Sequence, residues 1–208
     1  MYTADSIDVS FCLPVYNVGL YLEDCIKSIV NQPFAGISYE IICIDDCSTD
    51  DTYDILVHLS KKYDHIRVCK NEQNKGVSYT RNRMIDIAKG EYIWFIDPDD
   101  MLINGAVSYV RTAQTMNADV LLGNYIRINE DGSYDADLSK NDFYHDKIEV
   151  TDHFTPVDNH GERMWACWSG VFKRNFLLEN SLQFNEKMIA QEDTLFYFQF
   201  PYFFKFII

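Results

Sequence analysis

Three carboxylates directly follow an apolar run near the middle of the chain. The run spans residues 92–96 (YIWFI), and the sequence Asp-Pro-Asp-Asp occupies residues 97–100. Folding of a strand does not require so much negative charge at one end, whereas a hard divalent cation prefers oxygen ligands of this kind. A metal bound in this way bridges carboxylate and phosphoryl oxygens. The pattern therefore predicts a metal-dependent enzyme that acts on a phosphorylated substrate.

The elements that position these acids alternate between strand-like and helix-like patterns. Segments with helical spacing of apolar residues span 20–30, 51–63 and 77–88. Apolar runs that predict strands span 9–13, 40–44, 66–69 and 92–96, with Pro14 expected to end the first. Near-continuous apolar strands are typical of a parallel sheet buried on both faces, so we expect a doubly wound α/β half.

The second half of the chain has a different pattern. The expected elements are a helix from Asn104 to about residue 116, strands over 119–128 and 165–172, a hairpin turn over 129–133, a polar loop region over 139–162 and a short helix over 175–179. Such a mixture is typical of an α+β region. We expect one domain over residues 1–208, with a nucleotide-binding half (1–100) and a mixed α+β half (101–208).

Polar and aromatic side chains follow the predicted strands. Pro14 and Tyr16 follow the first, Asp45 continues the second, and Lys75 and Gly76 lie beyond the third. In open α/β sheets ligands bind outside the carboxyl ends of the strands, so these residues should share a rim with the acids. Asp45 can accept an imide N–H, as on a uracil ring, and an aromatic ring can stack on a base. A core position for the tyrosine and an ordinary turn at 75–76 are the structural alternatives.

Arg81 lies on the helix predicted after residue 76. It can pair with Asp86 or Glu91 nearby, or it can face a diphosphate. By contrast, Asp50 and Asp51 are expected only to favour the start of the following helix.

A second acidic pair, Glu192-Asp193, lies near the end of the chain. Two acids in this position are typical of a helix N-terminus. Trp165 and Trp168 precede a strand-like segment, and core packing is the simpler role for at least one of them.

Composition limits the partners. The formal net charge is -14, which argues against electrostatic binding to nucleic acid or to an anionic membrane. The six cysteines form no C-x-x-C pair, which argues against structural zinc. Residues 1–8 lack the features of a signal peptide, and a cytoplasmic protein is expected. The apolar tail over 196–208 is expected to be a core or capping segment, with a membrane-surface contact as the alternative.

Five segments together resemble the family 2 glycosyltransferases, which have a GT-A fold. They are VSFCLPVYN, EIICIDDCSTDDT, NKGVSYTRN, GEYIWFIDPDD and QEDTLFYF, in the order and spacing of that family. The family usually has Gly where Cys47 stands and often Ser at Pro98. The resemblance implies a Rossmann-like GT-A α/β fold. It also implies inverting, metal-assisted transfer of a sugar from a nucleotide sugar, expected to be UDP-linked, to a hydroxyl of a glycan or lipid-linked acceptor.

The resemblance implies roles for matching residues on the donor side. Asp99 would ligate Mg²⁺ or Mn²⁺, Asp97 would contact the ribose or a metal-bound water, and Asp100 would help to orient the sugar or the loop. The base would be held by Pro14, Tyr16 and Asp45, and the ribose and diphosphate would lie along Lys75, Gly76 and Arg81.

On the acceptor side the resemblance implies that Asp193 is the catalytic base, with Glu192 beside it. Trp165 would line the acceptor site. A lipid-linked acceptor would place the enzyme at the inner face of the membrane, as a peripheral protein.

Two other functions are alternatives to the transferase. Family members usually continue well past the Glu-Asp pair, so a C-terminal truncation is expected. The alternative function is then a non-catalytic nucleotide-binding fragment that lacks a complete acceptor site. A sugar-phosphate nucleotidyltransferase would need a Gly-rich, Arg-containing loop after the first strand, and residues 14–17 do not provide one.

Overall fold

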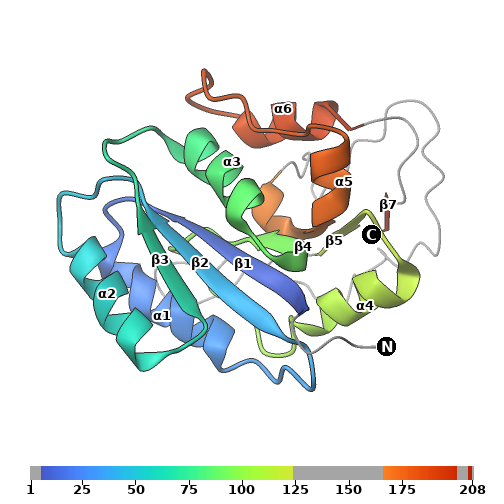
Figure 1. The fold of residues 1–208 in the computed structure, drawn as a ribbon, viewed down its shortest axis with the longest axis horizontal. Coiled ribbons are helices and arrows are strands. Elements are labelled where there is room, and N and C mark those ends of the chain that lie inside the picture. The colour runs from blue at the N-terminus through green and yellow to red at the C-terminus, as the bar shows by residue number, and fades with distance from the viewer. Residues whose placement is uncertain (1–5, 124–165, 201–205, 208) are drawn as a thin grey trace, which may run out of the picture.

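The computed structural model describes residues 6–123, 166–200 and 206–207 of the 208 residues. A twisted sheet has helices on both faces (Figure 1). Its strands are β1 (Ile7–Val15), β2 (Tyr39–Asp45), β3 (Ile66–Lys70), β4 (Gly90–Phe95), β5 (Val120–Leu122), β6 (Gly170–Lys173) and β7 (Phe206–Ile207). The helices are α1 (Gly19–Val30), α2 (Thr52–Lys62), α3 (Val77–Ile87), α4 (Ser108–Met116), α5 (Arg174–Glu179) and α6 (Glu192–Phe198), with a 3₁₀ turn at Cys167–Ser169.

The strand order is β3-β2-β1-β4-β6-β5-β7. The pairs β1–β2, β1–β4 and β2–β3 are parallel, whereas β6 runs antiparallel to both β4 and β5. The first half of the chain therefore forms a parallel sheet, and the second half extends it with a mixed edge. This confirms the predicted α/β class with a mostly parallel, doubly wound sheet.

Alternation along the strands separates two apolar cores. Phe11 and Trp94 belong to the core beneath α1, α2 and α4, whereas Cys12 and Phe95 belong to the core beneath α3, α5 and α6. Because successive side chains of a strand point to opposite faces, a strand buried on both sides needs a continuous apolar run. This is why the continuous runs in the sequence predicted the strands of the first half.

Three predicted boundaries are wrong. The first strand continues through Pro14 to Val15. The Cys12 carbonyl accepts the Ile96 N–H, so the backbone nitrogen of Pro14, two residues later, faces the same side as that carbonyl, at a level beyond the end of β4. The missing N–H of proline therefore costs no ladder bond there. Asn104 does not cap a helix, since α4 begins at Ser108. The stretch predicted as a strand over 165–172 instead contains a 3₁₀ turn before β6.

Some predicted features lie outside the described residues. They are Trp165, the hairpin turn at 129–133, the polar region at 139–162 and most of the strand expected over 119–128. In the described parts of the chain, no helix is long and apolar enough to cross a membrane.

Candidate active site

A pocket of about 220 Å³ opens at the carboxyl ends of β1 and β2, against the first turn of α3. It is lined by Pro14, Val15, Tyr16, Asp46, Asn74, Gly76, Val77 and Thr80. The Tyr16 side chain is 45% exposed, so its ring is available to a ligand at the mouth of the pocket. The size and the aromatic lip are sufficient for a flat heterocyclic base.

Asp46 organises the wall of this pocket. Its carboxylate accepts hydrogen bonds from the backbone N–H groups of Lys75 at 2.9 Å and Gly76 at 2.7 Å, and from Asn71 Nδ2 at 2.6 Å. Gly76 has a φ of 87°, which glycine adopts without strain. The Asp46 side chain therefore holds the loop between β3 and α3 in a conformation that places the start of α3 at the pocket.

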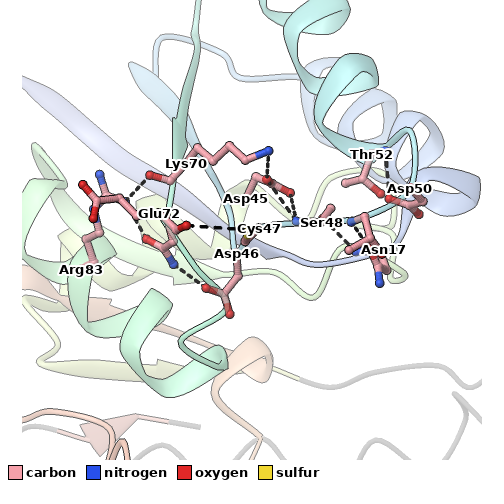
Figure 2. A network of polar contacts seen from close by, with 12 residues as sticks. Asn17, Asp45, Asp46, Cys47, Ser48, Asp50, Thr52, Lys70, Glu72 and Arg83 are labelled. Carbon is pink, nitrogen blue, oxygen red and sulfur yellow. Dashed lines mark hydrogen bonds and ion pairs between the residues drawn. The ribbon is translucent and has the colours of Figure 1, made fainter.

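Asp45 has a different environment, although it is the neighbouring residue. Its side chain is fully buried, accepts the Ser48 N–H at 3.2 Å and forms an ion pair with Lys70 Nζ at 3.2 Å. Figure 2 shows the Asp45 and Asp46 carboxylates pointing apart, toward different partners. In this geometry Asp46, not Asp45, lines the pocket.

The two loops after β1 and β2 are joined directly. Asn17 Oδ1 accepts the Thr49 N–H at 2.8 Å, and the Asn17 N–H donates to Ser48 Oγ at 3.0 Å (Figure 2). Asn17 has a φ of 51°, a left-handed conformation that asparagine tolerates. The Val18 N–H donates to Thr52 Oγ1 at 2.9 Å. These contacts fix the loop that carries Tyr16 relative to the end of β2.

The acidic strand end lies beside the pocket in the sheet. Cys12 of β1 pairs with Phe95 at the end of β4, so the acidic segment that follows β4 continues beside the end of β1. Asp99 and Asp100 are exposed. Although the residue as a whole is exposed, partial burial of its carboxyl group raises the pKa of Asp100 to about 6, and the nearby Asp97 and Asp99 add to the shift. Burial and the two neighbouring carboxylates both disfavour the charged form.

The residues at the strand end suit a divalent cation that a ligand helps to hold. In the described part of the chain, no three His, Cys, Asp or Glu side chains are arranged to hold a metal on their own. Asp97 is turned toward Arg81, whereas Asp99 is exposed and has no hydrogen-bond partner among the described residues. Mg²⁺ is commonly held by one or two carboxylates plus substrate phosphates, and Asp99 fits that pattern.

Arg81 joins the strand end to α6. Its Nη2 lies 3.0 Å from Asp97 Oδ1, and its Nη1 lies 2.9 Å from Glu192 Oε1 and 2.8 Å from Asp193 Oδ1. The structure therefore gives Arg81 other partners than the predicted Asp86 and Glu91. The three acids come from two segments that are distant in the sequence.

Glu192 and Asp193 occupy the first turn of α6, where acids favour the helix dipole. The expected helix N-terminus is thus present, and both acids also contact Arg81. Asp193 Oδ2 accepts the Cys167 N–H at 3.1 Å. Burial raises the pKa of Asp193, while the Arg81 guanidinium and the Cys167 N–H oppose the shift. A partly buried carboxylate with a raised pKa is suited to act as a general base.

A family model described as Glycosyl transferase family 2 matches residues 10–175. The chain belongs to this family. The matched span contains the pocket and the acidic strand end, and the Glu-Asp pair of α6 lies beyond it.

Curated relatives of this family 2 chain act on polymers and lipid-linked glycans, as their names state. The chain is 33% identical over 190 residues to a poly(ribitol-phosphate) beta-glucosyltransferase of Bacillus spizizenii, covering 90% of this chain and 28% of that protein. It is 34% identical over 188 residues to a GalNAc(5)-diNAcBac-PP-undecaprenol beta-1,3-glucosyltransferase of Campylobacter jejuni, covering 90% of this chain and 58% of that protein. The chain thus spans less than two thirds of the length of either relative.

Solved structures share the fold of the family 2 chain. S. aureus TarS 1-349 in complex with UDP-GlcNAc superposes with a TM-score of 0.71 at 23% identity, covering 93% of this chain and 53% of that chain. A mannosyltransferase from Pyrobaculum calidifontis in complex with GDP-Man and Mn2+ gives a TM-score of 0.69 at 18% identity, covering 98% of this chain and 55% of that chain. These likenesses confirm the predicted glycosyltransferase fold.

The structure gathers some of the predicted site residues of the family 2 chain and separates others. Pro14, Tyr16 and Gly76 line the pocket, whereas Lys75 is exposed with its ammonium 5.8 Å from the Tyr79 ring centroid. Asp46 lines the pocket although it is not among the predicted site residues. Its signal in the sequence is the doubled acid at the end of a buried strand, where it directly follows the predicted Asp45.

Proposed function

We propose that this chain is the donor-binding and catalytic part of an inverting glycosyltransferase. It would move a sugar from a nucleotide sugar, preferably UDP-linked, to a hydroxyl of a glycan or lipid-linked acceptor. The observation that carries the proposal is the adjacency of a base-sized pocket and an acidic strand end on neighbouring strands of one sheet edge. The complexes of structural relatives with UDP-GlcNAc and with GDP-Man are consistent with it.

In this proposal the pocket receives the base of the donor. The ring of Tyr16 stacks against it, and Pro14 forms the opposite lip. Val77 and Thr80 of the first turn of α3 line the same pocket, and Asp46 fixes the turn before them. Lys75, which is exposed at this turn, lies along the anionic part of the donor.

Asp99 would hold Mg²⁺ or Mn²⁺ together with the phosphates of the donor. A bound cation would neutralise the charge that develops on the leaving nucleoside diphosphate, without a protonated acid. Asp100 would lie beside the transferred sugar, where its charge favours the oxocarbenium character of the transition state.

Asp193 would accept the proton of the acceptor hydroxyl. An inverting displacement needs this base on the face of the sugar opposite the leaving group. Glu192 would contribute to the same acidic environment. A lipid-linked acceptor, as in the name of the Campylobacter relative, would bring the protein to the inner face of the membrane as a peripheral enzyme.

Calorimetry with UDP, followed by a screen of UDP- and GDP-sugars for metal-dependent release of the nucleotide, tests the proposal. UDP binding that strengthens with Mn²⁺, together with turnover of at least one donor, is expected. Absence of both would contradict it.

UDP binding without turnover of any donor would favour the second candidate, a non-catalytic nucleotide-binding fragment. The observation behind this candidate is that the chain spans 28% of one relative and 58% of another.

A further inference from the structure

One guanidinium connects the donor side of the site to its acceptor side. Arg81 on α3 contacts Asp97 just after β4 and both acids at the start of α6. Asp97 lies two residues before the proposed metal ligand Asp99, and Asp193 is the proposed base. Arg81 therefore contacts a residue from each of the two groups that the reaction must bring together.

Arg81 is not presented to a diphosphate in this geometry. Its side chain is only 4% exposed, and its two terminal nitrogens are already bonded to carboxylates. The ring of Phe184 lies against the guanidinium at 5.3 Å. The remaining nitrogen, Nε, is buried and has no hydrogen-bond partner among the described residues. A role in contacting the donor phosphates would require this buried cluster to come apart.

Charge makes Arg81 necessary at this junction. The side chains of Asp97, Glu192 and Asp193 are 29%, 16% and 18% exposed, so none is well solvated. One positive charge faces three negative charges. If the arginine were removed, the carboxylates would repel one another in a poorly solvated site, and the group that is able to move would do so.

The start of α6 is the group that is able to move. The later part of this helix is held by apolar packing, since Phe196 is fully buried and its ring stacks on Phe184 at a centroid distance of 4.1 Å. The acids of the first turn of α6 are bonded to the rest of the described structure through Arg81 and the Cys167 N–H. Loss of Arg81 should thus displace the first turn while the helix stays docked.

We propose that Arg81 is a positioning residue that holds Asp193 in place relative to the bound donor, and not a ligand of the donor diphosphate. The inference rests on the proposed transferase function. It assigns Arg81 to the chemical step: the arginine should affect how fast the bound donor reacts and should leave donor affinity unchanged.

The test compares Arg81→Met with Arg67→Met in the whole chain. Arg67 is the matched control, because it is a half-buried arginine whose Nη2 lies 3.6 Å from Glu40, far from the pocket edge of the sheet. Metal-dependent release of UDP from the donor found in the screen gives kcat, and calorimetry gives the Kd of UDP. We expect Arg81→Met to lower kcat by about 100-fold, as a displaced catalytic group does, with the Kd of UDP changed by less than about threefold. The control variant should change neither.

Two further variants sharpen the result. Arg81→Lys retains the charge but lacks the fork that spans three carboxylates, so its kcat should fall between wild type and Arg81→Met. The double variant Arg81→Met with Glu192→Gln should recover part of kcat, because removing one acid relieves the repulsion. A bond to the diphosphate would predict no such recovery.

A loss of UDP affinity in Arg81→Met that matches or exceeds its loss of kcat would overturn the inference. Amide exchange provides a readout that does not depend on turnover. Faster exchange confined to the first turn of α6 and to Cys167 supports the inference, and unchanged exchange there overturns it. If the wild-type protein neither binds UDP nor turns over a donor, the proposed function fails separately.

Discussion

Arg81 Nη1 lies 2.8 Å from Asp193 Oδ1, although the two residues are 112 positions apart in the sequence. This contact brings the start of α6 against α3 and the end of β4. It makes a carboxylate from beyond the matched family span part of the same charged cluster as the acidic strand end. Positions that sequence analysis assigned to the donor and to the acceptor are therefore physically coupled.

The stability of Arg81→Met should depend on pH. Burial raises the pKa of Asp97 and Asp193 above the ordinary value of 3.8, and Arg81 opposes both shifts. Without the arginine both values rise further. A carboxyl with a raised pKa stabilises the fold at low pH, and this contribution is lost as the pH rises through that pKa. Relative to wild type, the variant should thus be only slightly destabilised near pH 4 and by about 3–5 kcal/mol at neutral pH.

Urea unfolding at pH values between 4 and 8 measures this difference. A destabilisation that is constant over the range, or that shrinks as the pH rises, would show that the carboxylates do not depend on Arg81.

Asp193→Asn should retain UDP binding and lose turnover, because the amide cannot accept the proton of the acceptor. In the wild type, turnover should fall on the acid side through a pKa higher than that of an ordinary aspartate, since burial raises the pKa of Asp193. Rates measured from pH 4 to 8 and the Kd of UDP check both statements. Substantial turnover in the asparagine variant would remove Asp193 as the base.

Asp46→Asn should weaken UDP binding more than Asp45→Asn does. Asp46 lines the pocket and accepts two backbone N–H groups, whereas Asp45 is bonded to Ser48 and Lys70. Loss of a charged acceptor should cost about 1–3 kcal/mol in stability and lower UDP affinity by roughly tenfold as the turn relaxes.

Asp50→Asn is the control for this comparison, because that side chain is exposed in the same loop. A greater loss of UDP affinity in Asp45→Asn than in Asp46→Asn would instead support the role expected for Asp45 from the sequence.

Cys47→Gly should stabilise the protein. Cys47 has a φ of 64°, a conformation that costs an ordinary residue about 1–2 kcal/mol. Glycine adopts it freely, at an entropic cost of roughly 0.5–1 kcal/mol in the unfolded chain. The net gain should be about 0.5–1 kcal/mol by denaturant unfolding. Cys69→Gly, in the extended backbone of β3, should be destabilising; a loss of stability in both variants would show that the conformation at residue 47 is not strained.

The strands of the first half could be predicted from the sequence because burial on both faces requires continuous apolar runs, as in residues 92–96. The fold class followed from their alternation with amphipathic helices. The partners of Arg81 could not be predicted, since the sequence suggests only nearby acids such as Asp86 and Glu91, while the observed carboxylates lie 16, 111 and 112 positions away.

The different roles of the two adjacent acids could not be predicted from the sequence either. Asp45 and Asp46 carry the same charge at the same strand end, and the sequence does not reveal which one meets the loop after β3. The structure decides this because the N–H groups of Lys75 and Gly76 approach only Asp46. The family usually has glycine where Cys47 stands, and the positive φ of Cys47 supplies a physical reason for that preference.

The central claim is that the acids after β4 hold a cation that anchors a pyrophosphate beside the pocket. A crystal structure of the protein with Mn²⁺ and UDP tests it most directly, with Asp99→Asn as the paired variant. We expect the uracil ring to lie against Tyr16 and the metal to lie between Asp99 and the phosphates, with both ligands weakened or lost in the variant. A pocket that stays empty, with Asp99 directed into solvent and no metal beside it, would rule out this role of the acids.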